Sequence, residues 1–400
     1  MINKTTTAQV VMMLFTLLIY GAAAHNEQPK ELFPVTLSGR VGYIDRSGRM
    51  LISPQFDYAG DFFDGLAVIR LGDKYGYINT IGQIAIKPEF DFASPFNEGL
   101  AAIRLKYKYG FIDRTGQIII EPTFEGDKSA TSFRVPVFSE GLAAVKSDGK
   151  WGFINRTGKP AGELRFDCAW NYSEGRARVK IGDVWGYVDR TGKLIIKPQF
   201  SKASDFHEGL AWVVLNDRYG FIDSAGEVVI KPQFDQAFTF HEGLARVRVN
   251  NKYGYIDKTG KMVVKIQFDA ALDFSGGSAA AKIDDKFGYI DKRGNYVIPP
   301  RFDIAADFSE GLARVGVYNG DGTMRETINK AIAEAYSQAD EEAYFDTNYN
   351  WGYVTETGQM IINPQFNEAG SFSGGLAEVR INDKSAYIDK TGKVIWKETN

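Results

Sequence analysis

The sequence predicts an all-β protein, a tandem array of about ten antiparallel β-meander repeats of 34 residues each. A four-residue motif, an aromatic residue or Val, then Gly, an aromatic residue and Ile or Val, recurs at 34-residue spacing in seven of nine intervals. A Phe follows the motif Gly by fourteen residues in all nine full units, from Phe56 to Phe366, and a second Gly follows it by six. Self-similarity at a fixed period is typical of repeat architectures, whose neighbouring units share a continuous core.

Ahead of the array, residues 1–24 have the layout of a secretory signal peptide. Lys4 precedes an apolar run, Val10 to Ile19, and Ala22 to Ala24 supply the small residues of a cleavage site. A retained membrane anchor is the alternative, but the run is about half the roughly 20 residues that span a bilayer. We therefore expect an exported mature chain, residues 25–400, in the periplasm or outside the cell, without stable membrane insertion.

One unit shows which element each part of the repeat predicts. Residues 244–249 and 252–257 are β-favouring runs joined by a two-residue Asn turn, which predicts a hairpin. The Asp257 to Gly260 turn then leads into a third strand over residues 261–265. In seven units a Pro ends this strand, because Pro cannot donate to a ladder. The remaining Phe-Asp-x-Ala-x-x-Phe-x-Glu-Gly segment is predicted to be a connector, with a fourth short strand as an option.

Whether the array is open or closed depends on blade statistics. Propeller blades usually have four strands and 40 or more residues, and rings usually have four to eight blades. Ten units of 34 residues therefore favour an open twisted solenoid, with a propeller-like ring as the alternative. The motif Gly lies in mid-strand, where Gly normally weakens a sheet, so another group must approach it closely. We expect this group to be the ring of the Phe fourteen residues later.

Two of the nine intervals are longer than 34 residues. The 42-residue interval adds eight residues within Glu125 to Val137, and the 64-residue interval adds thirty within about residues 319–350. The longer insertion has apolar residues at helical spacing, and Thr323 with Glu326 forms a capping-box pattern, which together predict one α-helix near residues 323–345. Insertions in repeats map to loops on one face, often the binding face. The helix is predicted to be an attachment outside the array.

Composition and motifs argue against several classes of function. The 47 Lys and Arg residues nearly balance 50 Asp and Glu residues, so no basic field is available for nucleic acid. With Cys168 as the only cysteine, there is no intrachain disulfide and no zinc framework. No nucleophile elbow, phosphate-binding loop or acid/base pair stands out, so we predict a non-enzymatic protein without a cofactor.

His207 and His241 occupy the same phase of adjacent units, each followed by Glu. Two His and two Glu side chains would suit a metal. Because other units place Asn or Ser at this position, an exposed turn is the preferred interpretation. No metal site is predicted.

The aromatic residue before the motif Gly is the candidate binding feature. Repeated along one side of the array, it would form a ladder able to stack on sugar rings or hold a protein partner. The alternative is that these rings pack between units, since an array needs core aromatics. The ladder consists of Tyr75, Tyr109, Trp151, Trp185, Tyr219, Tyr253, Phe287 and Trp351.

The repeated string, [WYF]-G-[YF]-[IV]-[DN]-x-x-G followed by I-x-P-x-F-D-x-A and F-x-E-G-L-A, resembles the bacterial WG-repeat family, also called KWG repeats. The best matches are residues 150–154, 185–188 and 351–354, and the resemblance covers residues 41–397. It implies an all-β repeat and bacterial proteins whose biochemical roles are mostly undefined. We therefore expect a surface for protein binding or scaffolding in the cell envelope. The alternative is a carbohydrate or cell-wall binding module whose partner, an envelope polysaccharide, stacks on the aromatic ladder.

Overall fold

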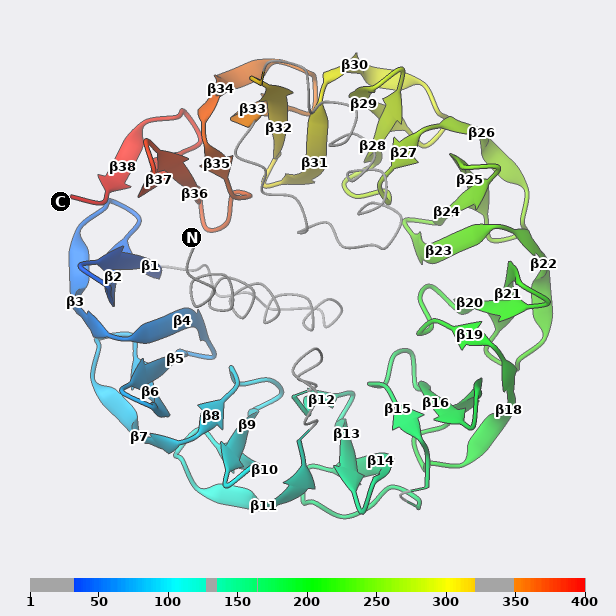
Figure 1. Ribbon diagram of the computed structural model, residues 1–400, viewed down its shortest axis with the longest axis horizontal. Coiled ribbons are helices and arrows are strands. Elements are labelled where there is room, and N and C mark those ends of the chain that lie inside the picture. Colours follow the sequence, from blue (N-terminus) through cyan, green and yellow to red (C-terminus); the bar gives the residue numbers. More distant parts are fainter. Residues whose placement is uncertain (1–31, 127–134, 164, 321–348, 400) are drawn as a thin grey trace.

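The computed structural model describes residues 32–126, 135–163, 165–320 and 349–399, and within them the chain forms ten antiparallel sheets in a closed ring (Figure 1). The all-β repeat prediction is confirmed, and so is its ring alternative. The preferred open solenoid is wrong, because the first and last sheets pack against each other. The signal peptide (1–24) and the helix expected near 323–345 lie outside the described residues.

Each sheet is a propeller blade whose strands run in order from the centre of the ring to its rim. Nine blades have an inner strand, which lies in the segment predicted from the sequence to be a connector with an optional fourth strand. The inner strands are β4 (Tyr58–Phe63), β8 (Phe92–Ala93), β12 (Phe138–Ser139), β15 (Cys168–Ala169), β19 (Lys202–Ala203), β23 (Gln236–His241), β27 (Ala270–Ala271), β31 (Ile304–Ser309) and β35 (Glu368–Ala369). The second strands are β1 (Leu32–Leu37), β5 (Leu66–Leu71), β9 (Leu100–Leu105), β13 (Leu142–Ser147), β16 (Ala177–Ile181), β20 (Leu210–Leu215), β24 (Leu244–Val249), β28 (Ser278–Ile283), β32 (Leu312–Tyr318) and β36 (Leu376–Ile381).

The third strands carry the repeated motif: β2 (Arg40–Asp45), β6 (Lys74–Asn79), β10 (Lys108–Asp113), β14 (Lys150–Asn155), β17 (Val184–Val188), β21 (Arg218–Asp223), β25 (Lys252–Asp257), β29 (Lys286–Asp291), β33 (Tyr349–Thr355) and β37 (Lys384–Asp389). The outer strands are β3 (Met50–Phe56), β7 (Ile84–Phe90), β11 (Ile118–Glu125), β18 (Leu194–Phe200), β22 (Val228–Phe234), β26 (Met262–Phe268), β30 (Tyr296–Phe302), β34 (Met360–Phe366) and β38 (Val394–Lys397). The blades are numbered in chain order, from blade 1 (β1–β3) to blade 10 (β35–β38). In blade 4 (β12–β14), isolated bridges to Pro160 and Phe166 take the place of an outer strand.

The meander gives the ring two distinct faces. Face A carries the Glu-Gly turns between inner and second strands and the Asp-x-x-Gly turns between third and outer strands. Face B carries the hairpin turns between second and third strands and the linkers from each outer strand to the next blade. This division holds in every blade because all neighbouring strands are antiparallel.

The motif Gly is required because the outer strand of its own blade approaches it. A Cβ at Gly220 would lie 2.6 Å from the carbonyl oxygen of Ile230 and 2.6 Å from the nitrogen of Pro232. The register shifts between Tyr219 and Phe221, so the outer strand bulges toward the glycine. The prediction of a close approach is confirmed, but the predicted group is wrong: backbone covers the glycine, while Phe234 pairs with Tyr219.

Neighbouring blades are joined by pairs of aromatic rings. The aromatic residue after the motif Gly packs on a ring in or just after the inner strand of the following blade, as Tyr77 does on Phe96 with ring centroids 4.9 Å apart. The Tyr77 hydroxyl also donates a 2.7 Å hydrogen bond to the carbonyl oxygen of Ser94. Such tilted or edge-to-face ring pairs contribute about 0.5–1.5 kcal/mol beyond their buried area. Repetition at each junction makes the core continuous around the ring.

The ring closes between blade 10 and blade 1, whose described part begins at its second strand, β1. Phe33 and Val35 of β1 form a buried cluster with Leu376 and Tyr387. The rings of Phe33 and Tyr387 lie 5.5 Å apart. Nearer the rim, Gly48 of blade 1 lies so close to blade 10 that a Cβ added to it would clash with the carbonyl oxygen of Ile395. Closure is therefore made by side-chain contacts, and within the described residues no strand of blade 1 pairs with blade 10.

Candidate functional site

The repeated charged residues on face B join consecutive blades. In six units an Asp follows the Phe that lies fourteen residues after the motif Gly, and this Asp stands in the linker between two blades; Asp167, in the linker from blade 4 to blade 5, is one example. One carboxylate oxygen accepts from Lys150 Nζ of blade 4 at 2.6 Å, and the other accepts from the backbone NH of Gly182 in blade 5 at 2.7 Å. The hydrogen bond from Lys150, followed by that from Gly182, lowers the pKa of Asp167. Both oxygens of this carboxylate are therefore engaged in contacts that join two blades.

Face A has a matching series of glutamates in its Glu-Gly turns. Glu242 accepts a 2.9 Å hydrogen bond from the NH of Gly277 in the next blade and pairs with Lys292 Nζ at 3.1 Å. Burial opposes ionisation, but the bonds from Lys292 and Gly277 outweigh it and lower the pKa of Glu242. The same inter-blade bond to a glycine NH is made by Glu98, Glu140, Glu174, Glu208, Glu242 and Glu310.

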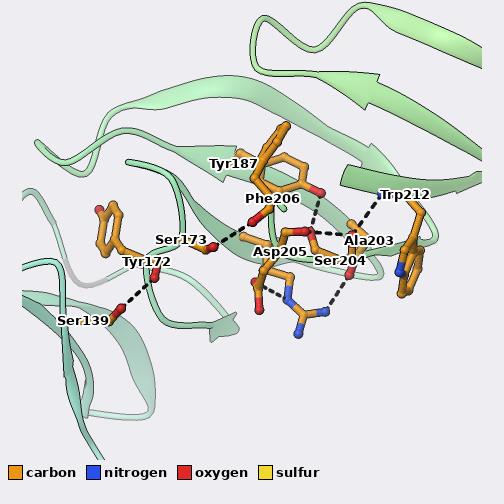
Figure 2. A network of polar contacts seen from close by, with 10 residues as sticks. Ser139, Tyr172, Ser173, Tyr187, Ala203, Ser204, Asp205, Phe206 and Trp212 are labelled. Atoms are coloured by element: carbon orange, nitrogen blue, oxygen red, sulfur yellow. Dashed lines mark hydrogen bonds and ion pairs between the residues drawn. The ribbon is translucent and has the colours of Figure 1, made fainter. Parts of the chain in front are cut away.

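The polar contacts in blades 4 to 6 show how inner strands are tied together (Figure 2). Ser173 Oγ donates to the carbonyl oxygen of Phe206 at 2.7 Å, and Tyr187 donates to that of Ser204 at 2.7 Å. Burial raises the pKa of Tyr187 well above its ordinary value, so its hydroxyl stays a donor. The side chains at these repeated positions therefore also form hydrogen bonds between neighbouring blades.

The two histidines predicted to be adjacent do lie together. The rings of His207 and His241 are 5.8 Å apart, and Thr239 Oγ1 lies 3.0 Å from His241 Nε2. The carboxylates of Glu208 and Glu242, however, are bonded to glycine NH groups of the next blades. Among the described residues, no group of three or more His, Cys, Asp or Glu side chains has a geometry suited to a metal ion.

Most of the predicted aromatic ladder is packed between blades. The rings at five positions are buried: Tyr75, Tyr109, Tyr253, Phe287 and Trp351. A cation from the adjacent second strand commonly covers such a ring, as Arg104 does Tyr109 at 5.9 Å. A continuous exposed ladder is thus absent at these five positions. The remaining members, Trp151, Trp185 and Tyr219, are half-buried and fall in consecutive blades, 4 to 6.

Two tryptophans that were not among the predicted residues extend this half-exposed group. Trp170 is 37% exposed, and the Arg178 guanidinium lies 4.1 Å from its ring and 5.5 Å from that of Trp185. Arg178 also pairs with Asp205 of the next blade at 2.9 Å. Trp212 packs on Tyr219 at 5.2 Å. Trp170 could have been singled out from the sequence, because most units have a small residue, Gly, Ala or Ser, at that position.

Departures from the repeat gather on face B. The shorter insertion follows β11 in a linker to the next blade, and the longer one joins β32 to β33 in place of a hairpin turn. Both positions belong to face B. Tyr107, in the hairpin turn of blade 3, is 83% exposed with φ at 66°. Each of the other two-residue hairpin turns in the described chain contains Asn, Asp or Gly, which tolerate positive φ, so a bulky residue here is unusual.

Comparison with protein families identifies the repeat. Nine segments match the WG containing repeat: 42–75, 75–109, 109–151, 151–185, 185–219, 219–253, 253–287, 287–320 and 351–384. The chain belongs to the WG-repeat family. No curated protein sequence matches it significantly.

Solved structures resemble this WG-repeat protein in fold alone. A eukaryotic initiation factor is 12% identical with a TM-score of 0.50, covering 92% of this chain and 96% of the other. PorZ, a surface component of the type-IX secretion system of Porphyromonas gingivalis, is 8% identical with a TM-score of 0.29, covering 86% and 52%. Dihydro-heme d1 dehydrogenase NirN is 12% identical with a TM-score of 0.36, covering 85% and 74%.

In the described part of the chain, no helix has the length and apolar character to cross a membrane.

Proposed function

We propose that this WG-repeat protein is a non-enzymatic scaffold that holds a protein partner on face B. The observation that carries the proposal is that both insertions enter the ring at face B, and that the shorter one follows blade 3, whose hairpin turn carries the exposed Tyr107. The repeated carboxylates of the linkers and Glu-Gly turns form blade-to-blade bonds, and those of the Asp-x-x-Gly turns bond within their own turn, so specificity must come from residues that break the repeat. An exposed aromatic anchor surrounded by variable loops is a common feature of protein interfaces.

The proposed setting is the cell envelope. The signal-peptide pattern of residues 1–24 supports export, and a ring without any disulfide would fold there on packing alone. Fractionation of the native host, with sequencing of the mature N-terminus, tests this part. Cleavage after Ala24 is expected, and recovery of the uncleaved chain in the cytoplasm would contradict it.

Partner capture with matched variants of the two faces tests the binding proposal. Tyr107→Ser removes an exposed apolar side chain from face B, and Ile81→Ser removes one that is 71% exposed from an Asp-x-x-Gly type turn on face A. A partner recovered from envelope extracts should be lost with Tyr107→Ser and retained with Ile81→Ser. Equal retention by both variants would contradict a face B interface, and turnover of a substrate would contradict a non-enzymatic role.

A polysaccharide-binding role is the second candidate, favoured by the half-exposed aromatic rings of blades 4 to 6. Trp170, Trp185 and Trp151 present partly open rings in consecutive blades, a surface on which sugar rings can stack. Sedimentation with purified peptidoglycan separates the candidates. Saturable binding lost in Trp151→Ala and Trp185→Ala, but kept in Tyr107→Ser, would favour the wall-binding module.

A further inference from the structure

Blade 1 has an unfilled edge among the described residues. In blade 3, inner strand β8 bonds to the second strand: Asp91 N donates to Arg104 O and Ser94 N donates to Ala102 O, each at 2.9 Å. The equivalent second strand of blade 1, β1, pairs only with β2 in the described chain. Its Thr36 and Pro34 stand at the positions of Arg104 and Ala102, so their carbonyl groups face the centre of the ring.

Pro34 does not block this edge. At its position in blades 3 and 6, the backbone NH donates to a serine hydroxyl, from Ala102 to Ser94 Oγ and from Trp212 to Ser204 Oγ. An inner strand therefore makes no backbone ladder bond that requires the NH missing from Pro34. The Pro34 carbonyl accepts from Tyr387 and has a second lone pair for another donor.

The charge beside this edge is opposite to that at the three junctions where the same position carries Arg178, Arg246 or Arg314. In blade 7, Arg246 reaches the next inner strand, where it pairs with Asp273 at 3.2 Å and is only 2% exposed. Blade 10 carries Glu378 at the same position, and this residue is exposed. Ser385 Oγ donates a 3.0 Å hydrogen bond to its carboxylate.

The sequence preceding β1 is not another copy of the inner strand. In the other units an aromatic residue and an acidic-Gly or Gly-Gly pair lie directly before the second strand, preceded by an Ala in all but one unit. Residues 22–31, Ala-Ala-Ala-His-Asn-Glu-Gln-Pro-Lys-Glu, have neither the Phe nor the Glu-Gly pair. Phe33 supplies the missing ring from β1 itself, where it packs on Tyr387.

We propose that blade 1 accepts an extended segment of a partner protein as its inner strand, with a Lys or Arg of that segment paired with Glu378. Main-chain bonds to Thr36 and Pro34 give such strand addition its affinity, and the charge pair gives it selectivity. The incoming residue next to Phe33 must be small, because Phe33 already fills the place of the inner-strand aromatic. This site at the centre of the ring is separate from face B, so either proposal can fail without the other.

A pair of synthetic peptides tests the proposal on the mature chain. The probe Asp-Lys-Ala-Ser-Lys-Ala-Ser-Glu-Gly keeps the inner-strand pattern, places Lys opposite Glu378 and replaces the aromatic residue by Ala; the comparison peptide has Asp in place of that second Lys. Fluorescence anisotropy should show the Lys probe binding at least about tenfold more tightly, a factor that corresponds to about 1.4 kcal/mol. The variant Glu378→Lys should reverse the preference, while Glu121→Lys on the rim should leave it unchanged.

Backbone pairing is tested by Thr36→Pro, which removes an NH that faces the open edge. Both peptides should lose affinity in this variant, and circular dichroism checks that the ring remains folded. Equal affinity of the two peptides, or no binding by either, would overturn the proposal. Binding that requires deletion of residues 25–31 would assign the place to the chain's own N-terminal segment instead. Peptide-sensitive dimers in sedimentation velocity would assign it to a second copy.

Discussion

Tyr387 donates a hydrogen bond of 3.0 Å to the carbonyl oxygen of Pro34, 353 residues away in the sequence. Equivalent tyrosines bond to the inner strand of the following blade, as Tyr353 does to Gly370 at 2.7 Å. In blade 1 the bond falls on the second strand instead, because the described blade has no inner strand. Closure thus uses the tyrosine at the same repeat position as the other junctions do, but the carbonyl group that accepts its hydrogen bond lies one strand further out.

Removal of the closing contacts is expected to weaken the whole ring. Tyr387→Phe should lower the free energy of unfolding by about 0.5–1.5 kcal/mol, the net value of one hydrogen bond. A double-mutant cycle of Phe33→Ala and Tyr387→Ala should give a coupling of about 0.5–1.5 kcal/mol for the ring pair. Urea unfolding measures both, with Tyr353→Phe as the control at an internal junction. Strict additivity in the cycle would show that the two rings do not hold the ends together.

Replacement of a motif glycine is expected to be more costly than strand propensity suggests. In Gly220→Val the new Cβ would meet backbone atoms of Ile230 and Pro232 at 2.6 Å, so the outer strand must shift. The loss should exceed the roughly 1 kcal/mol range of β-propensity, although Val favours strands. Gly60→Val is the control, since its Cβ would meet only side-chain atoms of Tyr58, at 3.2 Å or more, which can move aside. Similar denaturation midpoints for the two variants would contradict the close-approach explanation.

The turn aspartates are expected to make stability fall in acid. Asp189 Oδ1 accepts from the hydroxyl of Thr191 at 2.6 Å and from backbone NH groups, and the hydroxyl bond is the largest cause of the lowered pKa of Asp189. The folded chain then binds fewer protons than the unfolded one. Stability from this group is therefore complete above the ordinary Asp value of 3.8 and is lost as pH falls through the lowered folded value.

An unusual control for this effect exists within the chain itself. Asn155 occupies the same turn position in blade 4 and accepts the same bonds from Thr157, but it does not titrate. Asp189→Asn should therefore keep the turn and flatten the loss of unfolding free energy below the ordinary Asp pKa, whereas Asn155→Asp should steepen it. Urea titrations at a series of acidic pH values measure both slopes. An unchanged slope in both variants would show that these turns are not coupled to protonation.

The sequence predicts local elements far better than it predicts closure and exposure. The hairpin and Asp-x-x-Gly turns follow from residues whose conformations are restricted, such as Asn250 and Gly260. Inner strands as short as Phe92–Ala93 leave too few residues for an alternating pattern, so they resemble connectors. Closure depends on a small rotation between blades that no single residue encodes. The sequence also could not show whether the aromatic ladder is exposed, because both faces of a third strand carry apolar groups.

The last prediction is that the ring folds without the longer insertion. On either side of it, β32 and β33 pair in continuous register from Leu312 with Thr355 to Tyr318 with Tyr349, so the hairpin is already complete at the point of insertion. A two-residue turn such as Asn-Gly in place of residues 319–348 would close the same two strands. The β signal in circular dichroism and the urea midpoint should remain nearly unchanged, because surface loops contribute little to stability through closure entropy. Capture of a face B partner should weaken. Collapse of the fold would show that the insertion is structural, and undiminished capture would show that it takes no part in binding.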